Sequence, residues 1–277
     1  MKLSKELIAA GFSTPKDTPC RRLVIATVGM ASPATPAGEK TGKTHWALHG
    51  PQPVMVLATD TGTEEVARKC QAEGREVYVK QIDPPIVPAD ASVKERAKLY
   101  EPVWASAKEA FYSAIEDRGV RTLVVDTFTE LWEICRLCRF GKLAQVLPTD
   151  YGPVNAEFRE LIQHTKKRDD LVVILLHKNK KEYMSKTTAK GTMDSWTGKW
   201  ERAGFGDTSF LADINAVNYY YRRELEDGTW DKGFGLRVLN SRQEMMDLEG
   251  MELEGPMNTF QMLATLAFPG TTEEEWD

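Results

Sequence analysis

The sequence predicts an α/β protein with a mostly parallel, doubly wound sheet. Short apolar runs alternate with segments of helical periodicity as far as His177, which is the pattern of repeated strand–helix–strand units. The apolar runs are nearly continuous, as expected for strands that are buried on both faces. Because parallel strands are joined by right-handed crossovers, we expect helices on both sides of the sheet.

The expected elements follow in order along the chain. Pro102 is expected to kink or split the longest helix, because proline lacks an N–H and clashes with the preceding turn. Asp227-Gly228 is a strong hairpin signal, so a C-terminal β-hairpin is expected around it, followed by a short helix over 259–268. The expected strands are 22–28, 53–59, 76–82, 122–126 and 171–177, and the expected helices lie near 43–49, 63–73, 92–117, 128–140 and 153–167.

Composition and charge indicate how the chain is organised. With 277 residues, 42% hydrophobic, 28% charged and a net charge of -5, it can bury a sizeable core and is not a wholly basic nucleic-acid binder. No Lys or Arg follows Arg242, whereas nine acids do. We expect an N-terminal extension (1–21), a main domain (22–245) and an acidic C-terminal segment (246–277) that ends in a loose tail. The acidic end could keep the protein soluble, cover a basic surface or recruit a basic partner.

The cysteines and the N-terminus favour a reducing cytoplasm. Cys135 and Cys138 are spaced C-x-x-C within an expected helix, and no second pair completes a zinc site, so free buried thiols are expected. The first residues lack the apolar core of a signal peptide, and no stretch approaches membrane-spanning length. We expect a cytoplasmic protein with no membrane partner.

Residues 37–44, AGEKTGKT, fit the phosphate-loop pattern G-x-x-x-x-G-K-[ST], except that Ala37 stands first and the glycine comes one residue later. In such a loop, backbone N–H groups surround the phosphates, the lysine reaches the β- and γ-phosphates, and the next hydroxyl binds Mg²⁺. An ordinary capped helix start is the alternative. The expected nucleotide-binding residues are Gly38, Glu39, Lys40, Thr41, Gly42, Lys43, Thr44 and His45.

Three further strand ends carry polar groups. Asp126 ends a buried strand where a Mg²⁺ ligand belongs, although a helix-capping role is also open. Asp60 ends another strand, and Glu64 and Glu65 open the next helix. One of these carboxylates could orient the attacking water, or they could simply favour the helix dipole. His177 ends a third strand and could bond the γ-phosphate or be a structural histidine.

Residues 178–206 are expected to form a long polar loop. They hold seven basic residues against three acids, with aromatic residues between them. Cations that follow a phosphate backbone and aromatic faces that stack on bases suit single-stranded DNA. A loop that packs on a neighbouring subunit is the alternative. The candidate DNA-contacting residues are Lys178, Lys180, Lys181, Lys186, Lys190, Trp196, Lys199, Trp200 and Arg202.

The segments AGEKTGKTHWAL, VLATDTGTE, LVVDTFTEL, TDYGPVNAEFRELI and VVILLHKNK occur in this order. Together, over about residues 22–245, they resemble the phage-encoded RecA-like P-loop ATPases of single-strand annealing and recombination. The resemblance implies a RecA-like core and Mg-ATP bound between subunits of a homo-oligomeric ring or filament. It also implies single-stranded DNA as partner, a single-strand binding protein as a further candidate, and the host cytoplasm as location.

The resemblance also implies residue roles. Lys43 would bind phosphate, Thr44 would bind Mg²⁺, Asp126 would hold the metal through water, and His177 would sense the γ-phosphate. RecA-like proteins place a catalytic acid one or two residues after the second strand, where this chain has Thr61-Gly62. Glu64 is the nearest substitute, with Glu65 behind it. The candidates for a cation supplied by the neighbouring subunit are Lys199, Arg202, Arg237 and Arg242.

We therefore expect a protein that binds and hydrolyses ATP, slowly and with stimulation by DNA, in phage recombination or strand annealing. If neither glutamate reaches the water, ATP would act mainly as a switch. One alternative is a P-loop phosphotransferase on a small molecule, with 178–206 as a lid. Such a lid favours several arginines to clamp phosphates, and this one has a single arginine among six lysines. The other is a nucleotide-gated assembly factor that does not bind DNA.

Overall fold

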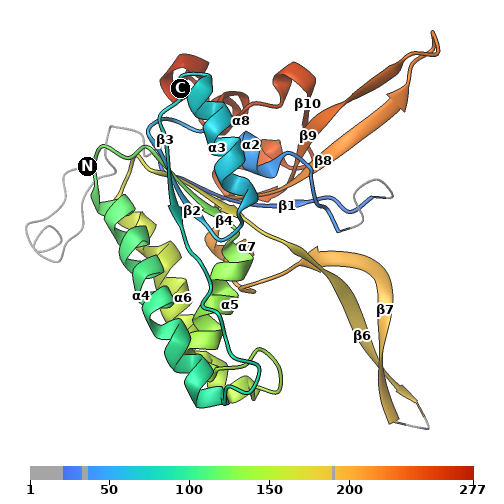
Figure 1. Cartoon of the computed structure of the whole chain (residues 1–277). Helices are drawn as coiled ribbons and strands as arrows, with labels where there is room; N and C mark the ends of the chain where they lie inside the picture. The colour runs from blue at the N-terminus through green and yellow to red at the C-terminus, as the bar shows by residue number, and fades with distance from the viewer. Residues whose placement is uncertain (1–20, 33–36, 189–190) are drawn as a thin grey trace, which may run out of the picture.

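The computed structural model describes residues 21–32, 37–188 and 191–277, and its centre is an eight-stranded sheet (Figure 1). The strands pair in parallel from β8 to β3, and the last two pairs at the other edge are antiparallel. This confirms the predicted mostly parallel α/β fold. In spatial order the strands are β10 (Glu252–Glu254), β9 (Trp230–Ser241), β8 (Ile214–Glu224), β1 (Leu23–Gly29), β5 (Val172–Leu176), β4 (Thr122–Asp126), β2 (Val54–Ala58) and β3 (Val77–Gln81).

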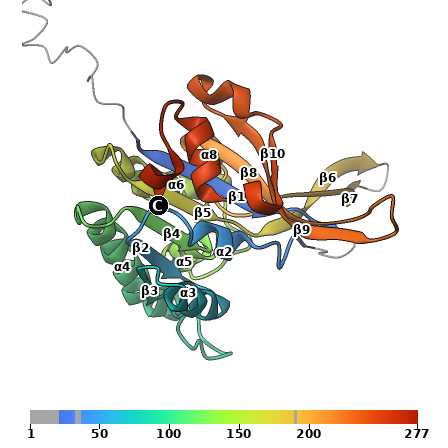
Figure 2. The same ribbon diagram turned by 90° about the horizontal axis from the view of Figure 1, so that it is seen from above.

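Helices cover both faces of the sheet, as Figures 1 and 2 show. Alternate strand residues point to opposite sides, so that Ile25 packs with one set of helices and Val24 with the other. A four-residue helix, α7 (Thr208–Leu211), precedes β8. One face carries α2 (Lys43–Ala47), α3 (Gly62–Ala72) and α8 (Phe260–Ala267); the other carries α4 (Val93–Glu116), α5 (Phe128–Phe140) and α6 (Tyr151–His164). The sheet is therefore doubly wound.

The expected split at Pro102 is wrong, because α4 runs unbroken through it for 24 residues. A capping box of Ser92 and Glu95 starts this helix. Tyr100 and Trp104, on either side of the proline, are both buried in the core. Packing of the buried face outweighs the lost hydrogen bond of one proline.

The segment after β5 forms a β-hairpin where a loop was expected. The strands β6 (Asn179–Thr188) and β7 (Gly191–Arg202) pair in antiparallel register, with Tyr183 opposite Trp196 and Lys181 opposite Trp200. The expected hairpin around Asp227-Gly228 is confirmed as β8 and β9. Both hairpins extend from the same side of the molecule, next to the end of β1 (Figures 1 and 2). We call them the β6–β7 arm and the β8–β9 arm.

The expected loose tail is also wrong, because the chain's end packs onto the sheet domain. Trp276 is 2% exposed and belongs to the same core cluster as α2, α3 and α8. Its ring stacks on Phe268, and its Nε1 donates to Thr271 Oγ1 at 2.9 Å. Arg75 pairs with the Asp277 carboxylate at 3.1 Å. In the described part of the chain, no helix has the length and apolarity needed to cross a bilayer.

Candidate nucleotide-binding site

The loop between β1 and α2 turns at two glycines with left-handed backbone, Gly38 at φ 71° and Gly42 at φ 79°. A Cβ on Gly38 would collide with the carbonyl oxygen of Gly29. Other residues rarely adopt this backbone conformation. Gly38 therefore makes the close turn one residue after the position where the pattern places it, and Ala37 is tolerated there.

Asp126 lies at the centre of a buried polar cluster beside this loop. Thr44 Oγ1 donates to Asp126 Oδ2 at 2.8 Å, and Thr63 Oγ1 donates to the same oxygen at 2.7 Å. Asp126 is 4% exposed, and this burial raises the pKa of its carboxyl, while the two threonine hydroxyls act in the opposite direction. The hydroxyl and carboxylate oxygens suit Mg²⁺, which prefers hard oxygen ligands.

Lys43 reaches into the same space from α2. Its Nζ lies 3.2 Å from the carbonyl oxygen of Gly38. Burial lowers the pKa of the Lys43 ammonium, whereas the nearby Asp126 carboxylate raises it. The lysine is thus held at the loop by a neutral acceptor, which a phosphate oxygen could replace.

These groups surround one cavity of about 420 Å³. Most of the residues expected at the nucleotide line it, while Thr41 is buried in the loop and does not. Gly42 and His45 line a separate cavity behind the loop. The residues lining the phosphate-loop cavity are Ala37, Gly38, Glu39, Lys40, Lys43, Thr44, Asp60, Asp126, Thr127, His177, Lys178 and Asn179.

Of the three acids that follow the second strand, Asp60 lines the cavity, whereas Glu64 and Glu65 do not. Both glutamates are exposed and pair with Arg68, each at 3.1 Å. Thr63, Ala67 and Cys70 are the buried residues of α3, and their spacing turns positions 64 and 65 to solvent. That spacing is visible in the sequence and could have predicted that Glu64 and Glu65 face solvent.

His177 lines the cavity, and a backbone carbonyl determines which of its two ring nitrogens carries the proton. Its Nδ1 lies 3.1 Å from the carbonyl oxygen of Ala203. Because a carbonyl only accepts, Nδ1 carries the proton in the neutral ring, and Nε2 is an acceptor. Nε2 is buried and has no partner among the described residues. As an acceptor, Nε2 of this tautomer can bond a water but cannot donate to a phosphate oxygen, so a direct bond from His177 to the γ-phosphate stays a prediction.

We expect His177→Gln to make the free energy of unfolding depend less on pH below about 6.5. Burial and the Arg202 charge lower the pKa of His177 to about 3, against the carbonyl of Ala203. The unfolded chain takes up this proton near pH 6.5 and the folded chain does not, so stability falls as the pH drops below that value. Between pH 6.5 and 5, the wild type should therefore lose about 2 kcal/mol more of its free energy of unfolding than the His177→Gln variant.

Urea unfolding of both proteins across that range measures this effect. His164→Gln, at a partly exposed histidine that packs against Tyr112, is the matched control. Parallel profiles for the wild type and His177→Gln would show that His177 is charged in the folded protein.

Asn179 ties the phosphate loop to the β6–β7 arm and was not predicted. Its Nδ2 donates to the carbonyl oxygen of Gly29 and, at 3.3 Å, to that of Ala37. Asn179 is the first residue of β6. A displacement of the loop on nucleotide binding would therefore act directly on the base of the arm.

Thr59 and Glu130 make a second connection, also missed. Thr59 Oγ1 donates to Glu130 Oε2 at 2.6 Å, and Glu130 pairs with Lys178. Lys178 itself lines the cavity. Neither residue belongs to a recognisable pattern, and only the folded arrangement brings them to the site.

A second cavity, of about 630 Å³, lies behind the loop at Gly42. The ring of Phe234, on β9, stands so close that a Cβ on Gly42 would lie 3.1 Å from its Cδ1. His45 and His49 also line this cavity, their rings 4.5 Å apart. The cavity has the apolar and aromatic lining that suits a nucleoside next to bound phosphates.

The β6–β7 arm presents some of the expected DNA-contacting residues to solvent. Lys181 Nζ lies 5.0 Å from the ring centroid of Trp196, which is 48% exposed. Lys180 is paired with Glu201 at 3.2 Å. The exposed cation–aromatic pair is the part of the arm that matches a stacking surface.

The other expected contacts are placed differently. Trp200 and Arg202 are partly buried at the foot of the arm, and Lys199 is exposed. Lys190 and the side chain of Lys186 lie outside the described residues. Of the remaining candidates for a neighbouring subunit's cation, Arg237 pairs with Glu252 and Arg242 with Asp213.

Comparisons with known proteins show which family this chain belongs to. A KaiC-like protein of Pyrococcus horikoshii OT3 has 12% identity and a TM-score of 0.39, covering 83% of this chain and 83% of that chain. The RadB recombinase has 13% identity and a TM-score of 0.41, covering 84% and 86%. Neither likeness supports a conclusion about function, and no curated protein matches significantly. The model of the family described as AAA domain matches residues 36–199, more than half of the chain, with Lys43, Asp126 and His177 inside the match. The chain therefore belongs to the AAA domain family.

Proposed function

We propose that this chain is a RecA-like P-loop ATPase that binds Mg-ATP, hydrolyses it, and binds single-stranded DNA in recombination or strand annealing. The arrangement of Lys43, Thr44 and Asp126 around one cavity carries the proposal. An ammonium, a hydroxyl and a buried carboxylate at the start of a helix are the groups that phosphoryl transfer requires.

The residues that line the cavity would have different roles in binding and hydrolysis. Lys43 would neutralise charge on the β- and γ-phosphates, and Thr44 and Asp126 would hold Mg²⁺, which offsets the charge that develops during transfer. Asp60 and His177 Nε2 are two acceptors that could orient a water. Asp60 lies two residues after β2, but its side chain is one methylene shorter than the glutamate typical of RecA-like proteins, so slow hydrolysis is expected.

The link to DNA runs through the β6–β7 arm. Asn179 connects the base of this arm to the phosphate loop, and the Lys181–Trp196 pair lies farther along it. A change at the loop on nucleotide binding would shift the arm and hence the strand. The proposed partners are single-stranded DNA and further copies of the chain in a ring or filament.

We expect Trp196→Ala to weaken binding of oligodeoxythymidylate about 5- to 150-fold, because one base–aromatic stack contributes about 1–3 kcal/mol. Lys181→Gln should lower the dependence of log K on log salt by about 0.7, the share of one phosphate on a single strand. Fluorescence anisotropy of a labelled oligonucleotide at several salt concentrations measures both. Tyr78→Ala, at an exposed tyrosine on edge strand β3, is the control. Equal affinity of the Trp196 variant, the control and the wild type would remove the arm from the proposal.

A further inference from the structure

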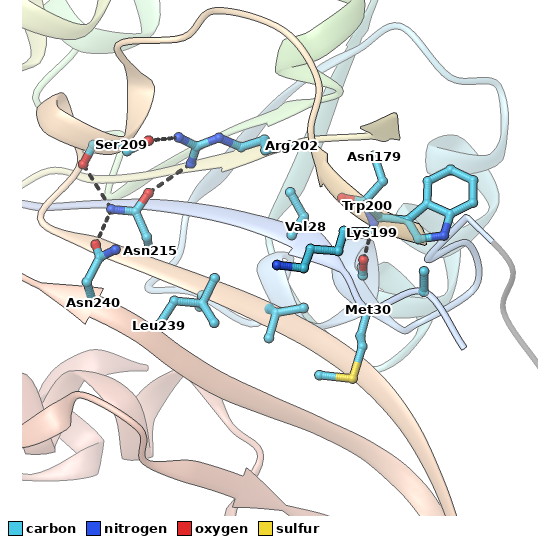
Figure 3. Close-up of a pocket in the computed structure, with 14 residues that line it drawn as sticks. Val28, Met30, Asn179, Lys199, Trp200, Arg202, Ser209, Asn215, Leu239 and Asn240 are labelled. Carbon is cyan, nitrogen blue, oxygen red and sulfur yellow. Dashed lines mark hydrogen bonds between the residues drawn. The ribbon is translucent and has the colours of Figure 1, made fainter. Parts of the chain in front are cut away.

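A cavity of about 550 Å³ lies at the foot of the β6–β7 arm, apart from the phosphate loop (Figure 3). Its walls come from the end of β1, from β7 and from β8 and β9. Among the residues that the structure describes, Asn179 is the one that lines both this cavity and the phosphate-loop cavity. We call it the arm-foot cavity. Its volume is that of a site for a small organic molecule.

The charge of the arm-foot cavity is unbalanced. Arg202 and Lys199 line it, and no Asp or Glu from the described part of the chain does. The Arg202 guanidinium is held by neutral acceptors: Nη1 donates to Asn215 Oδ1 at 2.8 Å, and Nη2 donates to Ser209 Oγ. Burial lowers the pKa of Arg202, as expected for a charge without a counter-ion.

Two other arginines, both on the eight-stranded sheet, are paired with carboxylates. Arg223 pairs with Asp231 and Glu254, and Arg237 pairs with Glu252. Within the described residues, Arg202 makes no ion pair with a carboxylate. Since a partly buried charge is costly without a counter-charge, the site is suited to an anion, and the fork of an arginine suits a phosphate.

The rest of the arm-foot cavity is mainly apolar. Val28, Met30, Val217 and Leu239 line it, and Trp200 adds an aromatic surface. Figure 3 shows Arg202 beside Ser209 and Asn215, with Trp200 and Met30 toward the other side of the site. A ligand that fits this division is anionic at one end and flat and weakly polar at the other.

Asn215 fixes the polar end. It accepts from Arg202, and its Nδ2 donates to the carbonyl oxygen of Ser209 at 3.0 Å and to Asn240 Oδ1 at 2.8 Å. Asn215 is 5% exposed. The guanidinium is thus positioned before any ligand arrives, which reduces the entropy lost on binding.

We propose that the arm-foot cavity binds one phosphorylated nucleoside, with its phosphate at Arg202 and Lys199 and its base against Trp200, Met30 and Leu239. The unit would be one nucleotide of the bound single strand, an assignment that rests on the proposed function, or a free nucleotide with the same groups. Through Asn179, this nucleotide would lie against the residue that ties the arm to the phosphate loop.

The test compares two variants that act in different ways. Arg202→Gln removes the charge and keeps hydrogen-bonding atoms, and Leu239→Trp fills the site from a side chain that is 51% exposed. Lys94→Gln, an exposed lysine on α4, controls for lost charge, and Ile86→Trp, at an isoleucine that is 96% exposed, controls for the added indole. Binding of a labelled ATP analogue at the phosphate loop reports that each variant is folded.

The first probe is oligodeoxythymidylate and the second is thymidine 5′-monophosphate, each with a non-hydrolysable ATP analogue saturating the phosphate loop. We expect both site variants to bind the oligonucleotide about 10-fold or more weakly and both controls to bind it within about 2-fold of wild type. Photocrosslinking of an oligonucleotide that contains 5-iodouracil should label Trp200 or Met30.

The outcomes separate the two proposals. If the wild type binds the oligonucleotide and both site variants bind it equally well, the arm-foot cavity is not a nucleotide site, and the proposed function stands. If the wild type binds no oligonucleotide but binds the monophosphate, and both site variants lose it, the site takes a free nucleotide and strand binding fails. If the wild type binds neither probe, both proposals are overturned.

Discussion

We expect Lys43→Ala to lower the rate of ATP hydrolysis about 100-fold or more, because a preorganised cation at the transferring phosphate contributes at least that much. The other lysines lining the cavity are Lys40, on the exposed part of the loop, and Lys178, which is paired with Glu130. Lys43 Nζ bonds only the carbonyl of Gly38 among the hydrogen bonds of the described residues, so the fold should not depend on it.

Phosphate release measures this loss, and thermal unfolding checks the fold. Lys94→Ala removes an exposed lysine on α4 and should leave both unchanged. Hydrolysis by Lys43→Ala within about 3-fold of the wild type would place the phosphates elsewhere.

Asp126→Asn is expected to lower activity and raise stability together. Loss of the carboxylate should lower Mg²⁺-dependent hydrolysis about 100-fold, because the amide is a poor ligand for a hard cation. The amide oxygen of the new side chain would still accept from the hydroxyls of Thr44 and Thr63, so the buried hydrogen bonds survive. The change removes a buried charge and keeps its partners.

The stability gain follows from the direction of the pKa shift. Burial raises the pKa of Asp126 above its unfolded value, so its favourable contribution exists at low pH and is lost as the pH rises through the folded pKa. Burial disfavours the ionised form of this carboxyl, and asparagine cannot ionise, so we expect the substitution by asparagine to raise Tm at neutral pH by about 2–4 °C.

Asp126→Ala is the matched comparison for both measurements. It also removes the charge, but it leaves two buried hydroxyls without their acceptor, which costs about 1–3 kcal/mol each. Calorimetry should place its Tm below the wild type and that of the asparagine variant above it. An asparagine variant with unchanged magnesium-dependent hydrolysis would show that Asp126 is a structural residue.

The buried sheet could be predicted because its strands are continuous apolar runs. The runs at 122–126 and 171–177 agree with β4 and β5 to within a residue or so. The β6–β7 arm could not be predicted, because its two strands pair outside the main sheet. The described side chains of both strands are largely exposed, so no alternation of apolar and polar residues marks them. The packed C-terminus was missed because a single anchor, Trp276, stands among polar residues.

The centre of the site could be predicted for a geometrical reason. The carboxyl ends of parallel strands meet at one edge of the sheet, so Asp126 and His177 fall beside the loop that holds Lys43. The roles of three other residues could not be predicted, because their contacts depend on how α3 and the two arms pack against that edge. These residues are Thr63, Asn179 and Phe234. Their roles appear only in the folded chain.

The central claim, that one chain couples ATP hydrolysis to single-stranded DNA, is tested most directly by the hydrolysis rate with and without oligodeoxythymidylate at low and high salt. We predict a Lys43-dependent rate that DNA increases and that high salt returns to the basal value, because strand binding is electrostatic. A rate that is indifferent to DNA at low salt, in a protein that still binds ATP, would contradict the claim.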